Sequence, residues 1–450
     1  MHFGIYFGLC LISIVLSLLL YRAYKYKGCS DNKALLLSYI FNAALMMLLS
    51  IFLLEPGGLD DDIVYQIDKA ARGFWGDLHP HGLAMAFWLT GKLMLGTIPL
   101  LIIQIMLFAT GVVGIFAMSN PKSVKQNIIL SSLMFFSHVS FNIFGMLYKD
   151  MLNGALYVFA AFLAICFHKL ESKLYRAIVL YACIILLSYG VFVCLNAPIA
   201  ALPIVLFLFW PYIARSWKLI FGAIILTIIS GFVLHKIHDK FSDERYFLTE
   251  LGLRRYELAY IAYKTSRVEL LDTNTWAAGL SSDNLEEIYG NGYYPSFYDA
   301  RTHIWSQGSL YKYFSKLKEP RPANQPVWAK EVSKRCFYAV SRYPLVYLKF
   351  KAYNALGALG IGMEPQCQAH SSDPEIGNRF GFRAVLNPIA FEFWKNHVGG
   401  MHHSFLMTPW IYFFISILLM IFIYFFAIPI AGFMLTLTTS SILMQAGCGQ

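Results

Sequence analysis

Charged residues are scarce in this chain. Asp, Glu, Lys and Arg together make up 14% of its 450 residues, whereas 58% are hydrophobic and 16% are aromatic. Soluble domains have about 25% charged residues, so this composition excludes an ordinary soluble protein. We expect a polytopic membrane protein that contacts membrane lipids and has no nucleic-acid partner.

Closely spaced cysteine pairs and a cleavable signal peptide are also lacking. No C-x-x-C pair occurs among the eight cysteines, which argues against a zinc or redox site of that type. Cys336 and Cys367 share a polar region, and we predict a disulfide between them in an oxidising compartment, with core packing of Cys336 as the alternative. The first apolar stretch has no basic n-region and no A-x-A site, so we expect a retained first helix.

Apolar segments of spanning length recur along the chain without an internal repeat of fixed period. The windows lie at 3–21, 35–54, 96–117, 127–147, 152–167, 177–195, 199–214 and 219–235, and two more fit in 409–446. A bilayer core takes about 20 apolar residues per helix, so we expect an α-helical polytopic membrane protein with about ten transmembrane helices. The lack of a repeat weighs against a duplicated transporter.

Lys and Arg cluster in alternate short loops between these windows. They are Arg22, Lys25, Lys27, Lys33, Lys122, Lys125, Lys169, Lys173, Arg176, Arg215 and Lys218. Basic short loops remain on the cytoplasmic side of a membrane. The connections at 55–95, 148–150, 195–197 and 236–408 are therefore expected together on the other face.

Hydropathy divides the chain into three parts. We expect a transmembrane module at 1–235 with its first outer loop at 55–95, an extracytoplasmic domain at 236–408, and a transmembrane hairpin at 409–450. Apolar residues at helical spacing within 242–270 and 332–358 indicate that the outer domain is mixed but largely helical.

The first outer loop contains Asp60-Asp61-Asp62 shortly after an apolar span. Adjacent carboxylates repel each other and are costly to bury, so a solvated loop is the simplest interpretation. Apolar residues then recur at helical spacing as far as Phe74, and again within 83–93. We expect two helices lying in the membrane interface with their apolar faces in lipid, and Asp62 at the N-terminus of the first.

Six short pieces of the chain together resemble one family. They are Pro56-Gly57-Gly58, Asp62 with Gln66, Asp77-Leu78-His79-Pro80, Phe144-Gly145-Met146 with Lys149-Asp150, Asn196-Ala197 with Leu202-Pro203, and Pro344 with Tyr347-Leu348. In this order they resemble bacterial polytopic membrane proteins related to the GT-C glycosyltransferases. The chain departs from the family pattern at His81, where Pro is usual, and at Lys351, where Arg is usual.

The resemblance implies an inverting glycosyltransferase of the bacterial inner membrane, with its active site facing the periplasm. The expected donor is a polyprenyl-phosphate-linked sugar, and the acceptor is a cell-surface glycan, lipid or protein. Asp62 is the expected general base, with Asp61 second, because a carboxylate must accept the proton of the acceptor hydroxyl. The residues expected to bind substrate are Lys149, Arg301 and Lys351 at the phosphate, and Gln66, Asp77, His79, Asp150 and Asn196 elsewhere.

Several of these residues also have simpler interpretations. Lys149 at a helix end can be an interfacial anchor, and Asn196 can belong to a turn between spans. Asp77, His79 and His81 have side chains that ligate divalent cations such as Mg²⁺ or Mn²⁺, although residues spaced so closely more often form a hydrogen-bonded turn. We expect no other cofactor.

Two other functions agree with parts of the sequence. A transporter or flippase for a lipid-linked glycan needs charged residues inside its spans, where this chain has few titratable groups besides His138. An O-antigen polymerase or ligase would bind a diphosphate through outer arginines. The arginines available for that role are Arg254, Arg255, Arg301 and Arg321.

Overall fold

Helices make up every regular element in the part of the chain that the structure describes. The computed structural model describes residues 2–28, 30–54, 61–73, 81–93, 97–118, 124–136, 147–194, 197–213, 218, 221–222, 225, 229, 233, 248–271, 285 and 327–358. The expected helical fold class is confirmed within these ranges. The windows at 219–235 and 409–446 lie largely or wholly outside them, so the count of ten spans stays a prediction.

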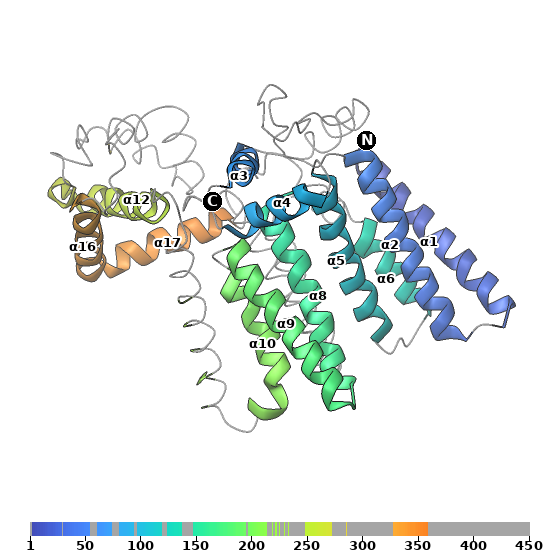
Figure 1. Ribbon diagram of the computed structural model, residues 1–450. Coiled ribbons are helices and arrows are strands. Elements are labelled where there is room, and N and C mark those ends of the chain that lie inside the picture. Colours follow the sequence, from blue (N-terminus) through green and yellow to red (C-terminus); the bar gives the residue numbers. More distant parts are fainter. Residues whose placement is uncertain are drawn as a thin grey trace.

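A bundle of roughly parallel and antiparallel helices forms the larger body of the protein (Figure 1). Its described members are α1 (His2–Tyr26), α2 (Asp31–Leu54), α5 (Ile98–Met118), α6 (Val124–Phe136), α8 (Lys149–Lys169), α9 (Lys173–Val193) and α10 (Ala197–Ile213). Four described segments are long and apolar enough to cross a membrane: Asp31–Ile51, Ile98–Met118, Lys149–Lys169 and Lys173–Val193. The protein is therefore a membrane protein with transmembrane helices.

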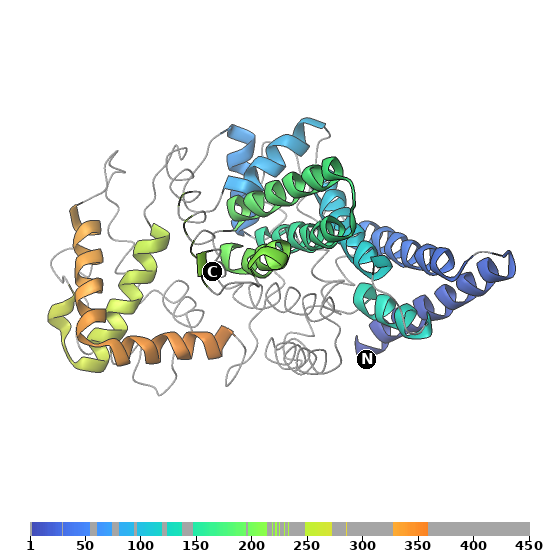
Figure 2. The ribbon, with the colours of Figure 1, turned by 90° about the horizontal axis from the view of Figure 1, so that it is seen from below.

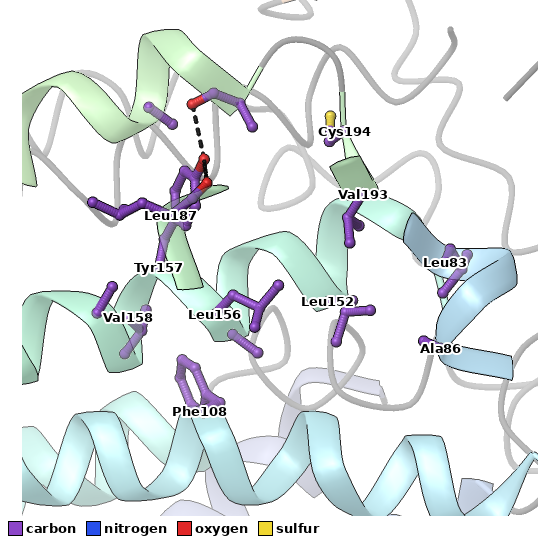
Figure 3. Close-up of a cluster of buried hydrophobic side chains, with 14 of the residues drawn as sticks. Leu83, Ala86, Phe108, Leu152, Leu156, Tyr157, Val158, Leu187, Val193 and Cys194 are labelled. Carbon is purple, nitrogen blue, oxygen red and sulfur yellow. Dashed lines mark hydrogen bonds between the residues drawn. The ribbon is translucent and has the colours of Figure 1, made fainter. Parts of the chain in front are cut away.

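Close backbone contact holds α5, α8 and α9 together in the bundle core. A Cβ atom added at Gly111 of α5 would lie 2.9 Å from the backbone nitrogen of Phe159 in α8, so only glycine permits this approach. Figure 3 shows Phe108 of α5 facing the α8 side chains that surround Tyr157. The Tyr157 hydroxyl reaches the carbonyl oxygens of Leu187 at 3.3 Å and Ala197 at 3.2 Å, which ties α8 to α9 and α10.

A buried polar cluster joins α1, α2 and α6. We call it the Asn42 junction, and it consists of Asn42 with Ser13, Ser17, Ser131 and Ser132, all of them fully buried. Ser13 and Ser17 donate to Asn42 Oδ1 at 2.8 and 2.6 Å, and Asn42 Nδ2 donates to Ser131 and Ser132 at 3.2 and 3.1 Å. Both atoms of the amide group are thus satisfied without water, as an apolar surrounding requires.

The described residues of the connection 55–95, expected as the first outer loop, form two short helices, as expected. They are α3 (Asp61–Arg72) and α4 (His81–Leu93), and both lie at one end of the bundle (Figure 1). The expectation that the apolar face of α3 lies in lipid is wrong. Ile63, Ile67 and Ala70 are at most 1% exposed and belong to the main core, because α3 packs on α4 and the bundle end covers its apolar stripe with protein. On α4, Phe87 is buried likewise, whereas Leu89 remains 50% exposed.

The basic connections α1–α2 and α8–α9 lie at the bundle end opposite α3 and α4 (Figure 1). Lys25 lies in the last turn of α1, which ends there, and Lys169 and Lys173 flank the α8–α9 connection at the same end. The Lys169 ammonium donates to the carbonyl oxygen of Met118 at 2.6 Å, so the ends of α5 and α8 are linked. Among the described connections, the two basic ones therefore lie at one end of the bundle, and α3, α4 and the start of α8 lie at the other.

A second group of helices lies beside the bundle, level with the end that bears α3 and α4 (Figures 1 and 2). It comprises α12 (Leu248–Thr265), the short 3-10 helix Val268–Leu270, α16 (Val327–Arg342) and α17 (Pro344–Ala358). We call it the outer helical unit. Its separate core includes Leu258, Ile261, Val332, Ala339 and Phe350. The expected helices within 242–270 and 332–358 are confirmed for the described residues.

Candidate functional site

Two expected carboxylates begin helix α3 at one end of the bundle. Asp61 and Asp62 are its first two residues, so the backbone of Asp62 lies in the first helical turn, where a negative charge is favoured by the helix dipole. The sequence expectation placed Asp62 at this helix start. Asp77 and His79 lie outside the described residues.

Gln66 is the clearest polar feature of α3. It lies four residues after Asp62, and residues at this spacing share one helix face. The side chain is 3% exposed, and neither Oε1 nor Nε2 has a hydrogen-bond partner. A buried amide without partners is destabilising by about 1–3 kcal/mol. Its two atoms offer one donor group and one acceptor, which suits a ligand rich in hydroxyl groups.

Lys149 and Asp150 are the first two residues of α8, and both are half-buried. The thiol of Cys194, directly after α9, donates to Asp150 Oδ1 at 3.1 Å. Asp150 was expected to bind substrate, and its carboxylate accepts a hydrogen bond from this thiol. Sequence reasoning missed Cys194, because a cysteine at the edge of an apolar span carries no distinguishing pattern.

The start of α4 docks against the end of α9 beside this pair. A Cβ atom at Gly82 would lie 2.5 Å from the carbonyl carbon of Phe192, and the Tyr189 hydroxyl donates to Gly82 O at 2.7 Å. Figure 3 shows Leu83 of α4 close to Val193, with Cys194 following. His81 precedes Gly82 and is 6% exposed. The first outer loop is thus held directly against the helix end that contacts Asp150.

A metal centre finds no support in the part of the chain that the structure describes. No three His, Cys, Asp or Glu side chains within those residues are grouped so that they could hold an ion. Of the proposed ligands, His81 is described, whereas Asp77 and His79 are not. The metal alternative therefore stays a prediction.

Lys351, the third expected phosphate ligand, belongs to the outer helical unit beside the bundle. Lys351 lies in α17 of the outer helical unit, and its ammonium pairs with Oε1 of Glu257 in α12. Burial alone would lower the pKa of Lys351, but the hydrogen bond and charge of Glu257, together with Tyr347, raise it above its usual value. Asn196 and Arg301 lie outside the described residues.

The predicted disulfide between Cys336 and Cys367 is not formed. Cys336 is a free, buried cysteine whose thiol donates to Glu257 Oε2 at 3.5 Å. Burial, and then the charge of Glu257, raise the pKa of this thiol to about 12, so it stays protonated and unreactive at neutral pH. The alternative of core packing is the one that the structure supports, and Cys367 lies outside the described residues.

Comparison of the chain with models of protein families, with characterised proteins and with solved structures finds no match. The function must therefore be argued from the arrangement of its residues.

Proposed function

We propose that the protein is an integral-membrane glycosyltransferase. It transfers a sugar from a polyprenyl-phosphate carrier to a glycan, lipid or protein acceptor on the non-cytoplasmic face. The observation that carries the proposal is that two helix starts with carboxylates lie at the same end of the bundle. Helix α3 begins with Asp61 and Asp62, α8 begins with Lys149 and Asp150, and the basic connections α1–α2 and α8–α9 lie at the opposite end (Figure 1).

The proposed transfer needs a base and a cation at the membrane surface. The acceptor hydroxyl gives its proton to the carboxylate of Asp62 while its oxygen attacks the anomeric carbon of the sugar. The bond from that carbon to the phosphate oxygen breaks, and the polyprenyl phosphate leaves with the electron pair. Lys149 stabilises the charge on the departing phosphate at headgroup level, where α8 begins.

Gln66 supplies the recognition of the sugar in this proposal. Its amide group has the donors and the acceptor that pair with neighbouring hydroxyl groups, and it lacks partners of its own. A ligand that satisfies the buried amide removes the free-energy cost of leaving it unpaired. Because Gln66 and Asp62 share one face of α3, a sugar bound by Gln66 would also be positioned near the base.

The distribution of charge inside the bundle supports catalysis at its end over translocation through it. Among the described bundle helices, Asp, Glu, Lys and Arg occur only within the first or last five residues. A flippase for a charged lipid-linked glycan places such residues along an internal pathway. The buried polar groups of the bundle interior, such as the Asn42 junction, are neutral.

Transfer is tested with the purified full-length protein in lipid nanodiscs and a panel of radiolabelled polyprenyl-phosphate sugars. Asp62→Asn keeps the shape of the side chain and should lower kcat by about 10² or more, as expected for loss of a general base. Lys149→Met should raise KM for the donor and leave KM for the acceptor unchanged. Lys173→Met, at the opposite end of the bundle, is the matched control and should behave as wild type.

Three outcomes would contradict the proposal in different ways. Near-normal turnover of a well-folded Asp62→Asn variant would mean that Asp61 is the general base, or that neither carboxylate is. Transfer only from a diphosphate-linked oligosaccharide would indicate a polymerase or ligase. Movement of labelled carrier across vesicles, without any glycosidic product, would indicate a flippase.

A further inference from the structure

Two side-chain oxygen atoms near the start of α8 face the last turn of α9. The Cys194 thiol, which follows Val193 where α9 ends (Figure 3), donates to Asp150 Oδ1 at 3.1 Å. Three residues further along α8, a Cβ atom added at Gly190 would lie 2.6 Å from Asn153 Oδ1. The N–H of Cys194 donates to Gly190 O at 2.8 Å, so both oxygens meet the same turn of α9. We call Asp150, Asn153 and this turn the α8–α9 oxygen cluster.

Asn153 supplies a hydrogen-bond acceptor that the fold does not use. The residue is 3% exposed, and its Oδ1 has no hydrogen-bond partner. In the Asn42 junction, by contrast, the amide oxygen accepts two hydrogen bonds and the amide nitrogen donates two. A buried acceptor without a partner is destabilising, so its presence requires a reason. A ligand that contacts Oδ1 of Asn153 removes that cost.

Asp150 brings a negative charge to the same place. Its side chain is half-buried, and within the described residues the partner of its carboxylate is the Cys194 thiol, which carries no charge. The first turn of a helix favours an acidic side chain, which accounts for the position of Asp150 in α8. It does not account for the unpaired oxygen of Asn153 further along the helix. The two acceptors together indicate a positively charged ligand.

The end of α9 adds to this negative potential. The helix ends at Val193, and the last carbonyl groups of a helix lack N–H partners in a following turn and carry partial negative charge. Carboxylate, amide and backbone carbonyl oxygens are the ligands that hard cations prefer. In membrane transporters, the C-terminal ends of helices coordinate Na⁺ in this way. The cluster therefore has the ligand types of a cation site that needs no His or Cys.

We propose that the α8–α9 oxygen cluster binds Na⁺. Side chains three residues apart on a helix have Cβ atoms about 5–6 Å apart, so oxygens of Asp150 and Asn153 can contact one ion. The single carboxylate balances a single positive charge, whereas Ca²⁺ sites typically use several carboxylates. The bound ion joins the start of α8 to the end of α9, next to the point where α4 docks at Gly82. This inference is independent of sugar transfer and of the divalent metal considered for the first outer loop.

Binding of radioactive ²²Na⁺ to the full-length protein tests the proposal. The purified protein in nanodiscs is titrated with ²²Na⁺ in a scintillation proximity assay, and choline chloride holds the ionic strength constant. We expect saturable binding of one ion per chain. Asp150→Asn and Asn153→Leu should each weaken it at least about tenfold, because even residues that only orient metal ligands change affinity by that much. Asn42→Leu removes a buried amide whose atoms are already paired, so this matched control should bind as wild type.

A gain of Ca²⁺ binding separates an ion ligand from a packing residue. Asn153→Asp keeps the oxygen and adds a second carboxylate, so Ca²⁺ should compete with ²²Na⁺ at least about tenfold better than in wild type. Loss of folding cannot produce that result. Absence of saturable ²²Na⁺ binding by the wild-type protein would overturn the proposal. So would wild-type affinity in both Asp150→Asn and Asn153→Leu, or displacement of ²²Na⁺ from the wild-type protein by Ca²⁺ more readily than by unlabelled Na⁺.

Discussion

The Asn42 junction gives the sharpest test of what holds the bundle together. Asn42→Leu keeps the branching of the side chain at Cγ but removes the hydrogen bonds to Ser13, Ser17, Ser131 and Ser132. A side-chain hydrogen bond between membrane helices contributes about 0.6 kcal/mol on average, so four such bonds give about 2–2.5 kcal/mol. This sum is an upper limit, because each serine can donate instead to a backbone carbonyl of its own helix. Ser131 already does so to Ile128 O at 3.0 Å.

Reversible unfolding in mixed micelles of dodecylmaltoside and dodecyl sulfate, followed by circular dichroism, measures this loss. Ser38→Ala is the matched control, because Ser38 is fully buried on the same helix and, among the described residues, donates to backbone carbonyls, those of Ala34 and Ser17. We expect it to cost clearly less than Asn42→Leu. A double-mutant cycle that combines Asn42→Leu with Ser132→Ala should give a coupling free energy of about 0.6 kcal/mol between the two residues. An Asn42→Leu protein as stable as wild type would refute the reasoning, since apolar packing alone would then hold the three helices.

Three further predictions concern the site and its orientation. Gly82→Ala should destabilise the protein by about 1–3 kcal/mol and reduce any transfer activity, because the added Cβ would meet the backbone of Phe192. Gly222→Ala is the control, because Gly222 has open space around it. Equal stability of the two variants would contradict the docking of α4 on α9. At pH 8, Cys336 should form thiolate about 10³-fold less than an ordinary thiol of pKa 9.0, and alkylation should slow accordingly; a disulfide to Cys367 in non-reduced mass spectra would contradict this. Thiol labelling of Gly58→Cys and Gly290→Cys should occur from the same non-cytoplasmic side, and labelling from opposite sides would contradict both the topology and the mechanism.

Local pattern accounts for the features that the sequence predicted correctly. The helices α3 and α4 begin and end close to the expected residues, because apolar spacing and the position of Asp62 are properties of neighbouring residues. The position of the basic α1–α2 and α8–α9 connections at one end of the bundle follows in the same way, because successive spanning helices run in opposite directions.

The packing of distant residues decided the rest. Periodicity identifies the apolar stripe of α3, but only the tertiary structure shows that Ile63 and Ile67 are covered by protein and not by lipid. The partner of Asp150 is a thiol 44 positions away, which no local pattern indicates. The disulfide between Cys336 and Cys367 was predicted from the oxidising compartment and the polar region that the two residues share. The Cys336 thiol instead contacts Glu257, because α12 and α16 pack together in the outer helical unit. Sequence alone determined that this is a helical membrane protein and where many of its helices lie, because hydrophobicity and spacing act locally. The burial and pairing of its polar groups depend on which helix faces meet, and that was decided only by the fold.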